Sequence, residues 1–527
     1  MRIEGKPGPI SRKAFLGMGG MSAAALVLSG TPLGALGARA ARGEAPPAAL
    51  GYGPLVNKGD LWLPAQFNYQ VISRQGQIQR DGNPTPGIFD GMGAFPDTGD
   101  GVNPTADTTI LIRNHENRER AGEQKVVTGP AFEYDEATFG GCTKLVVRRS
   151  PVNKKNRLTG EPLYRYEVLD SFNIIGGTST NCAGGEVPFQ KWITCEEVVK
   201  GPSGTSTPDT IVPLPPKKHG YIFEVNAMSD GPVQALPITS AGRFEHEAAV
   251  WRESILYMTE DRRVEADPVL GQIGACLYRY KPDQSIGQST NLAETTGPVE
   301  ALKVKDVFHK NMDTEIEVGV PLAVEWVTVE DPDHDDDTNN RRDRVPGFTP
   351  TRIQAQDKGA AYFDRQEGMW VGQGGQGDSK IYFDCTEGGP NNLGQIWEYD
   401  PGRETVTLVY QSTDPIRLEN PDNITIVPQT GDVLICEDSP GEQFIRGVTI
   451  DGEIYDFAKT QTNNTEFCGA CFDPDGNTLY VNQQGERGSL PNGPPNQEAV
   501  TYAIYGPFGD RAGANDKDFG TGRPPNK

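Results

Sequence analysis

Acidic residues follow directly on short apolar runs at four places in the chain. The runs are residues 192–197 (WITCEE), 256–261 (LYMTED), 381–387 (IYFDCTE) and 433–438 (VLICED). If they are equivalent strands of a radially repeated sheet fold, their carboxylates meet around one axis. Two carboxylates about 4 Å apart repel by roughly 4 kcal/mol at an effective dielectric near 20, and a domain is stable by only about 5–15 kcal/mol. Such a cluster needs cations or protons, so the pattern predicts a metal site.

The composition favours carboxylate ligands over histidine ligands. The chain has 72 Asp+Glu against 49 Lys+Arg, and its net charge of −23 disfavours nucleic acid and anionic membrane surfaces as partners. Its 5 histidines form no H-x-x-x-H or H-E-x-x-H pair, which makes a histidine-built zinc site a poor interpretation. Cys468 and Cys471 form a single C-x-x-C, which fits a disulfide or buried packing at least as well as a metal site.

Cys182 lies in the densest motif of the chain, residues 176–185 (GGTSTNCAGG). Glycines on both sides of it let the backbone bend sharply and approach a bound group closely. The motif is accompanied by N-H-E at residues 114–116, T-C-E-E at 194–197 and G-R-F-E-H-E at 242–247. Many hard oxygen ligands suit Ca²⁺, and one thiolate among them indicates a transition metal without identifying it.

Strand-like runs bounded by Gly, Pro, Asn and Asp recur along the chain after residue 50. Aromatic-rich runs at residues 220–226, 275–282, 395–401 and 452–457 alternate with the acidic runs. Imperfect repetition at a scale of about 40–65 residues predicts an all-β fold, a β-propeller with loop insertions. An array of β-sandwiches is the competing architecture.

The N-terminal segment has the features of an export signal. Residues 11–16 (SRKAFL) precede a Gly/Ala-rich apolar stretch and small residues near a cleavage site. The segment is similar to a twin-arginine signal with Lys13 in place of the second arginine, and the ordinary secretory route or a membrane anchor are alternatives. We expect residues 1–42 to be the signal and 43–527 a single propeller domain, periplasmic or secreted. No later segment reaches the roughly 18 uninterrupted apolar residues that a spanning helix needs.

Together these motifs resemble the PhoX-type alkaline phosphatase family. In the first half the matches are N-H-E (114–116), G-G-T-x-x-N-C-A-G-G (176–185), T-C-E-E (194–197), H-G-Y-x-F-E-V (219–225), R-F-x-H-E (243–247) and Y-x-T-E-D (257–261). In the second half they are R-x-E-G (365–368), P-D-N (421–423), C-E-D (436–438) and the run 466–476. The resemblance covers most of the chain after the signal.

The resemblance implies an exported six-bladed propeller that hydrolyses small-molecule phosphate monoesters at a centre of two irons and calcium. It implies that Cys182 bridges the two irons and that Arg365 grips the phosphate. It also implies that metal oxygens come from Glu116, Glu196, Glu197, Glu247 and Glu367, with Glu437, Asp438 and Glu466 as candidates to complete the shell. We expect the protein to act as a monomer.

The residues themselves leave alternatives open. Arg365 can hold two phosphoryl oxygens in a fork, or it can be a structural ion pair beside Glu367. The chain has no G-x-S-x-G elbow, which favours direct attack on phosphorus over a covalent phosphoserine. A propeller hydrolase of another ester class, such as a lactonase or phosphodiesterase, is a second hypothesis, because fold and metal do not fix the substrate. A metal-stabilised, non-catalytic scaffold is a third.

Overall fold

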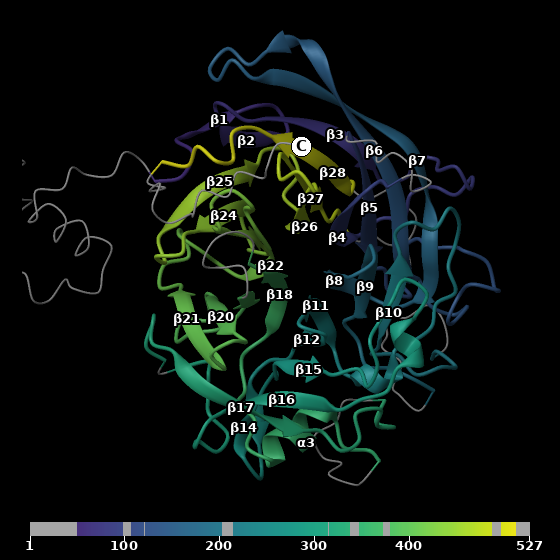
Figure 1. Cartoon of the computed structure of the whole chain (residues 1–527), viewed down its shortest axis with the longest axis vertical. Helices are drawn as coiled ribbons and strands as arrows, with labels where there is room; N and C mark the ends of the chain where they lie inside the picture. Colours follow the sequence, from purple (N-terminus) through teal and green to yellow (C-terminus); the bar gives the residue numbers. More distant parts are fainter. Residues whose placement is uncertain are drawn as a thin grey trace, which may run out of the picture. The chain divides into compact units, whose positions relative to one another are not determined.

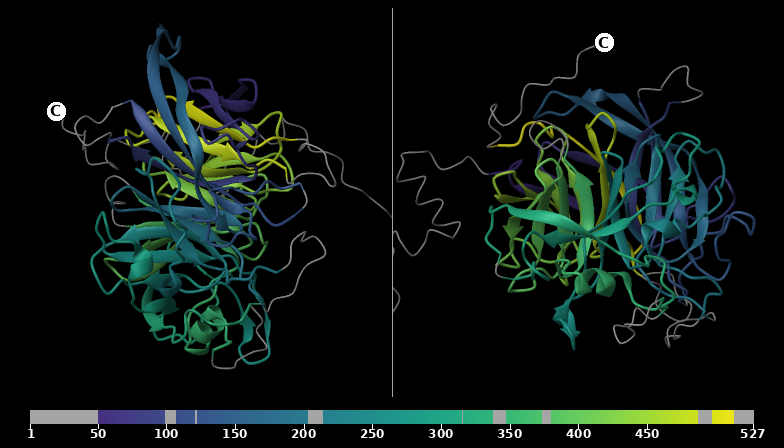
Figure 2. Two further views of the ribbon diagram at one scale, coloured as in Figure 1. Left: turned by 90° about the vertical axis from the view of Figure 1, so that its right-hand side faces the viewer. Right: turned by 60° about the horizontal axis from the view of Figure 1, so that its bottom comes forward.

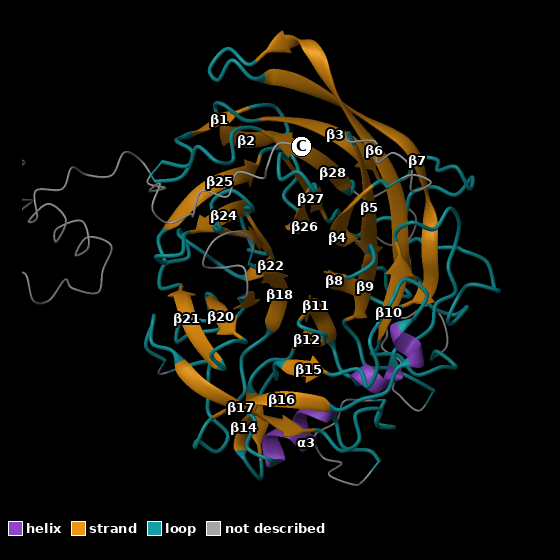
Figure 3. Cartoon of the chain, viewed as in Figure 1, coloured by secondary structure: helices purple, strands orange, loops and turns teal. Residues whose placement is uncertain are grey.

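Strands and loops make up nearly all of the chain that the computed structural model describes, namely residues 50–98, 107–120, 122–202, 214–314, 316–337, 347–372, 380–486 and 497–512. Helix in these residues is limited to α3 (Thr351–Asp357) and two 3-10 turns, η1 (Thr239–Ala241) and η2 (Leu292–Glu294), which confirms the all-β prediction (Figure 3). None of the described helices is long and apolar enough to cross a membrane. The predicted export signal, residues 1–42, lies outside the described residues.

The strands pair in antiparallel sheets that follow the chain in order. The first four-stranded sheet contains β4 (Phe89–Pro96), β5 (Thr108–His115), β6 (Gly140–Lys155) and β7 (Pro162–Thr178). The three-stranded sheet contains β8 (Asn181–Val187), β9 (Lys191–Glu196) and β10 (Ile222–Asn226). Figure 2 shows the long β6–β7 hairpin extending beyond the neighbouring strands.

A nine-stranded sheet follows, in the order β11-β12-β15-β16-β17-β21-β20-β19-β18. Its first five strands are β11 (His246–Arg252), β12 (Ile255–Glu260), β15 (Tyr278–Tyr280), β16 (Val299–Val304) and β17 (Leu322–Thr328). The other four are β18 (Gln366–Val371), β19 (Ile381–Cys385), β20 (Gln395–Asp400) and β21 (Thr405–Gln411). Only two residue pairs, Leu322 with Val406 and Ala323 with Thr405, join β17 to β21. The sheet is therefore two units held by a short edge contact, and β13 (Glu265–Asp267) and β14 (Gly271–Ile273) form a separate hairpin.

The last two sheets bring the two ends of the described chain together. One has the order β1-β2-β25-β24-β23-β22, with β1 (Leu55–Asn57), β2 (Leu61–Pro64), β22 (Pro421–Ile426), β23 (Val433–Glu437), β24 (Phe444–Val448) and β25 (Ile454–Thr460). The other contains β26 (Phe467–Phe472), β27 (Thr478–Gln483), β28 (Val500–Tyr505) and β3 (Asn68–Arg74). Because β3 pairs with β28, an N-terminal strand completes a C-terminal sheet.

Six strands, here called the inner strands, form a closed series around a common axis: β4, β8, β11, β18, β22 and β26 (Figure 1). Each contacts the next, and β26 contacts β4. The sheets thus radiate from the axis in a propeller-like arrangement. The four predicted aromatic runs contribute β10, β15, β20 and β25, away from the axis. Within one sheet, the rings of the paired residues Phe383 of β19 and Trp397 of β20 stack at 6.2 Å with an interplanar angle of 8°.

Every inner strand carries a β-bulge near its start. The register shifts lie between Phe89 and Met92, Asn181 and Gly184, His246 and Ala249, Gln366 and Met369, Pro421 and Ile424, and Cys468 and Cys471. A bulge bends its strand and re-aims a side chain. The second residue inside each bulge is small or short, namely Gly91, Ala183, Ala248, Gly368, Asn423 and Ala470. A Cβ on Gly91 would come within 2.6 Å of the Cα of Ala183, so neighbouring inner strands touch through their backbones here.

Gly185 tests the importance of this close approach. A Cβ at Gly185 would lie 1.5 Å from the carbonyl oxygen of Ala249, so Gly185→Ala forces β8 and β11 apart. We expect a loss of roughly 1–3 kcal/mol of unfolding free energy, measured by urea denaturation. Gly231→Ala is the matched control, since a Cβ there meets nothing within 4 Å, and it should leave stability unchanged. Equal stability of the two variants would contradict the backbone contact.

Candidate metal centre

The bulges place one chemistry-bearing side chain from each of five inner strands at an equivalent position. The first residue inside the bulge is Asp90, Cys182, Glu247, Glu367 or Asp422, and all five are buried. On the sixth inner strand this position is Gly469, and Cys468 precedes it. A position-equivalent set that is acidic or thiol in five strands, and buried in all of them, is the arrangement expected of cation ligands at the axis.

These side chains form one cluster together with residues that follow other strands. Ligand atoms lie within 4.8 Å of one another in four groups: Cys182, Glu197 and Glu247; Glu197, Asp261 and Glu367; Glu247, Glu367 and Asp422; and Asp90, Glu466 and Cys468. The first three groups are joined because they share Glu197, Glu247 and Glu367. The fourth group adjoins them, since Cys182 Sγ lies 3.5 Å from Oδ2 of Asp90. We call these nine residues the central cluster. Five of the nine are residues that the sequence had suggested: Cys182, Glu197, Glu247, Glu367 and Glu466.

Consecutive acidic residues at the strand ends divide into two roles. β9 ends at Glu196, β12 at Glu260 and β23 at Glu437, and the next residues are Glu197, Asp261 and Asp438. Because successive side chains of an extended chain point in opposite directions, only one of each pair can face the axis. Glu197 and Asp261 belong to the central cluster. Asp438 hydrogen-bonds Glu466 and contributes to the raised pKa of that carboxyl.

Glu196 lies in a hydrogen-bond network beside the cluster. Its carboxylate accepts backbone N–H groups of Ser179 (3.0 Å), Gly220 (2.8 Å) and Tyr221 (3.1 Å). It also lies 2.7 Å from Nδ1 of the buried His219, whose pKa is raised by Glu196 and Asp135 against the opposing effect of burial. With both oxygens occupied, Glu196 ties the segment around Ser179 to β10.

Glu437 has a comparable position on β23. Its Oε1 accepts two hydrogen bonds, one from Nε–H of Arg446 at 3.0 Å and one from the backbone N–H of Glu419 at 3.1 Å. The structure brings neither Glu196 nor Glu437 together with the central cluster. Of the three residues that the sequence left undecided, Glu466 joins the cluster and Asp438 contacts it.

Burial shields the carboxyl groups of the cluster from water and so opposes their ionisation. Burial, followed by the neighbouring carboxylates, raises the pKa of Glu247, Glu367, Glu197, Asp90 and Glu466 well above the ordinary range. The same causes raise the pKa of Asp422 to about 7. Without cations, these groups keep protons that they would release in water.

Glu247 provides the sharpest test of whether the residues fit metal ions. The side chain is fully buried, and within the described residues neither carboxylate oxygen has a hydrogen-bond partner. A buried carboxylate with two orphaned oxygens costs free energy unless a cation or proton satisfies it. The surrounding donor set, oxygens with one or two sulfurs, fits both a hard cation and a transition metal.

Cys182 is a free thiol, as are the other seven cysteines of the chain. Burial and then the charge of Asp90 raise the pKa of the thiol, so a thiolate here requires a cation beside it. Asn114, from the N-H-E motif, fixes the backbone around the thiol by donating to the carbonyl oxygens of Cys182 and Ala183, each at 2.7 Å. Thr180 enters β8 with a φ of 52°, a left-handed conformation that turns the chain sharply into the strand.

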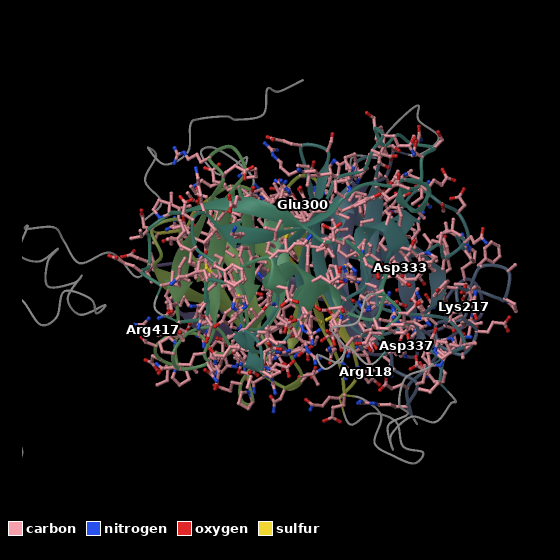
Figure 4. All side chains as sticks on the ribbon, turned by 90° about the horizontal axis from the view of Figure 1, so that it is seen from below. Arg118, Lys217, Glu300, Asp333, Asp337 and Arg417 are labelled. Atoms are coloured by element: carbon pink, nitrogen blue, oxygen red, sulfur yellow. The ribbon has the colours of Figure 1, made fainter. Side chains whose placement is uncertain are left out.

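Two arginines face the cluster. Arg365 forms a bidentate pair with Asp261, in which Nε donates to Oδ1 at 2.8 Å and Nη2 donates to Oδ2 at 2.9 Å. The same Nη2 also lies 2.7 Å from Oε1 of Glu367. Arg118, labelled in Figure 4, pairs with Glu116 at 2.5 Å and lies 3.6 Å from Glu197. Both guanidinium groups remain partly exposed, so a substrate can reach them.

Sequence reasoning missed Asp90, Asp261, Asp422, Cys468 and Arg118. Asp261 and Asp422 belong to the Y-x-T-E-D and P-D-N motifs that carried the resemblance, so the sequence pointed to both residues although no metal-binding role was predicted for them. Arg118 follows the N-H-E motif by two residues, a weaker signal. No sequence signal pointed to Asp90, because it does not follow an apolar run like those that precede the other acidic residues.

Comparison with known proteins settles the family. The model of the alkaline phosphatase PhoX family matches residues 50–486. The chain belongs to this family. It is therefore a phosphoric monoester hydrolase, in agreement with the resemblance of its motifs.

A solved structure of the same family has a similar fold. Pseudomonas fluorescens PhoX, determined with vanadate as a transition-state analogue, is 16% identical with a TM-score of 0.60, covering 89% of this chain and 99% of that one. The WD40 domain of Toxoplasma gondii coronin is 10% identical with a TM-score of 0.28, covering 81% and 89%, which is too distant to bear on this chain. No curated protein matches the sequence.

Glu247→Gln should change stability in opposite directions with and without metal. A carboxyl whose pKa rises on folding destabilises the native state above its unfolded pKa, so in chelator at pH 8 the variant should gain roughly 1–3 kcal/mol. The gain should vanish below about pH 4.5, where the unfolded glutamate is protonated too. With metal present, the variant should bind less metal and lose stability relative to the parent. Urea denaturation across pH, with the exposed Glu136→Gln as control, checks this; a variant no more stable than the parent in chelator at pH 8 would argue against buried repulsion.

Glu196 and Glu197 should respond differently to the same substitution. Glu196→Gln disturbs several buried charge-assisted hydrogen bonds and should cost roughly 2–3 kcal/mol of unfolding free energy even in chelator. Glu197→Gln should cost no stability in chelator, because the pKa of this carboxyl is raised like that of Glu247, and it should lower the bound metal, measured by elemental analysis. The reverse pattern would exchange the roles assigned to the two residues.

Proposed function

We propose that the central cluster is the active site at which this phosphatase cleaves phosphate monoesters. The observation that carries the proposal is the gathering of buried carboxylates and a thiol from separate sheets beside two partly exposed arginines. Arginine forks match phosphoryl oxygens, and they have no comparable role in a lactone site or a non-catalytic scaffold.

The resident cations of this proposal are two irons and calcium. Cys182 would hold iron through sulfur, and Glu116, Glu197, Glu247, Glu367 and the aspartates of the cluster would supply oxygens. Bound cations polarise phosphoryl oxygens, lower the pKa of bound water and offset charge in the transition state. Glu196 and Glu437 act in this proposal as supports of the neighbouring ligand residues.

Arg365 has the further task of holding the phosphoryl group. Its fork is closed on Asp261, so substrate binding requires the guanidinium to exchange that carboxylate for phosphoryl oxygens. The φ of Arg365 is 52°, and such a left-handed conformation in a non-glycine residue is kept where the surroundings demand one direction for the side chain. Arg118 offers a second cation on the Glu116 side of the cluster. In the proposed reaction the oxygen of water attacks phosphorus directly, the P–O bond to the alcohol breaks, and the alcohol leaves with a proton as inorganic phosphate forms, without a covalent phosphoserine.

Six blades are the proposed architecture. The closed series of six inner strands supports this count, and so does the two-pair contact between β17 and β21, which divides the nine-stranded sheet into two blades. We also propose a single domain over residues 43–527, export through residues 1–42 to the periplasm or medium, and a monomeric enzyme.

The direct test is hydrolysis of p-nitrophenyl phosphate by the purified chain before and after chelation, with elemental analysis. Cys182→Ala should lose iron and activity together. Arg365→Ala should lower kcat/KM by about 100-fold, because it removes a charge-assisted fork on the phosphoryl group, with Arg365→Lys intermediate. Arg417→Ala, an exposed arginine far along the chain, is the control and should keep full activity. Turnover that survives both Cys182→Ala and Arg365→Ala would refute this active site.

A further inference from the structure

A second cavity lies at the other end of the inner strands. Its volume is about 360 Å³, within the range of small-molecule sites. It is lined where four inner strands end, by Pro96 of β4, Val187 of β8, Ile426 of β22 and Phe472 of β26. The central cluster occupies the beginnings of the same strands, so at about 3.3 Å per residue the two sites are roughly 10–20 Å apart. A separate void of only about 10 Å³ is lined by the small bulge residues, among them Gly91, Ala183 and Gly368.

Aromatic side chains from different elements line this cavity. They are Phe95 of β4, Phe189 of the β8–β9 turn, Trp370 of β18 and Phe472 of β26. Phe189 is 48% exposed and has a φ of 69°. A bulky residue in the left-handed region is an outlier that a turn of this kind ordinarily avoids by using glycine or asparagine. Gln190, the second residue of this turn, also has a positive φ of 56°, so the turn keeps an exposed phenyl ring at the edge of the cavity despite the backbone cost.

The charge of the lining has one sign. Among its 17 residues are the carboxylates Glu186, Asp473 and Asp475 and no lysine, arginine or histidine. Asp473 and Asp475 pair with Arg149 at 2.9 and 3.3 Å. Glu186 is exposed, and in the described parts of the chain it forms no ion pair with any lysine or arginine. Its Oε1 accepts the backbone N–H of Ala94 at 3.1 Å, which leaves its charge uncompensated.

We propose that this cavity binds a small organic cation, such as a quaternary ammonium or a protonated amine with an apolar body. Aromatic faces attract such cations, and the attraction grows when the cation is desolvated. Glu186 supplies the opposite charge, whereas an anion would be repelled and a neutral ligand would leave the carboxylate unmatched. An inorganic cation would need six or more oxygens, while the walls here are mostly aromatic, aliphatic and proline. This site goes beyond the phosphatase function and does not rest on it.

The decisive comparison uses choline and its uncharged carbon isostere, 3,3-dimethylbutan-1-ol. Both are titrated calorimetrically into the metal-loaded full-length chain at pH 8.5. Although the residue has exposed surface, desolvation by the surrounding protein raises the pKa of the Glu186 carboxyl to about 7, and pH 8.5 lies far enough above this value to keep the group ionised. Choline should bind saturably with one site, at least about tenfold more tightly than the isostere. Equal affinity of the two compounds, or no saturable binding of choline, would overturn the proposal.

Two variants locate the site. Glu186→Gln should weaken choline binding by about tenfold or more, whereas Glu136→Gln, an exposed glutamate elsewhere, should not change it. Phe189→Gly removes the ring and relieves its left-handed backbone, so it should abolish choline binding without lowering Tm. Unchanged choline affinity in both site variants would overturn the proposal.

Enzyme kinetics separates this cavity from the central cluster. Choline at saturating concentration should leave p-nitrophenyl phosphate hydrolysis unchanged, and the two variants should keep parental kcat and KM. Competitive inhibition by choline, with an inhibition constant equal to its Kd, would place the cation in the central cluster and refute a separate site.

Discussion

Repulsion among buried carboxylates is the interaction on which the rest of this structure depends. Glu247, Glu367 and Asp422 are buried, and their carboxylate oxygens lie within 4.8 Å of one another. Each carboxylate raises the pKa of the next, and the arginines at the edge offset only part of the charge. A fold that holds such groups together must be rigid, and bound cations or protons must compensate the charge of the carboxylates.

The closed series of inner strands supplies that rigidity. A bulge at the same place in each strand turns one side chain toward the axis, and the small residue beside it lets neighbouring backbones touch. At the end of β9, Glu196 accepts hydrogen bonds that fasten the backbone around the Cys182 motif, while Glu197 belongs to the central cluster. Adjacent residues therefore have different roles: Glu197 contributes to the cluster, and Glu196 stabilises the backbone beside it.

The sequence predicted much of this arrangement, and its failures have physical reasons. The all-β class and the third strands of several sheets followed from short aromatic runs bounded by turn residues. Cys182, Glu247 and Glu367 followed from motifs. The direction of Glu196 and Glu437 could not be predicted, because it depends on where a strand ends relative to a bulge, and a bulge leaves no regular mark in the sequence. Closure through β3 and β28 was equally hidden, since strands from opposite ends of the chain carry no local sign of pairing.

The measurement that bears most directly on the central claim is anomalous X-ray diffraction from crystals of the active protein, recorded on both sides of the iron absorption edge. If the proposed cations are correct, we expect two iron peaks beside Cys182 Sγ and ordered calcium among the surrounding carboxylates, including Glu247 and Asp422. An active protein whose cluster contains only water, with protons shared among the carboxyl groups, would contradict it.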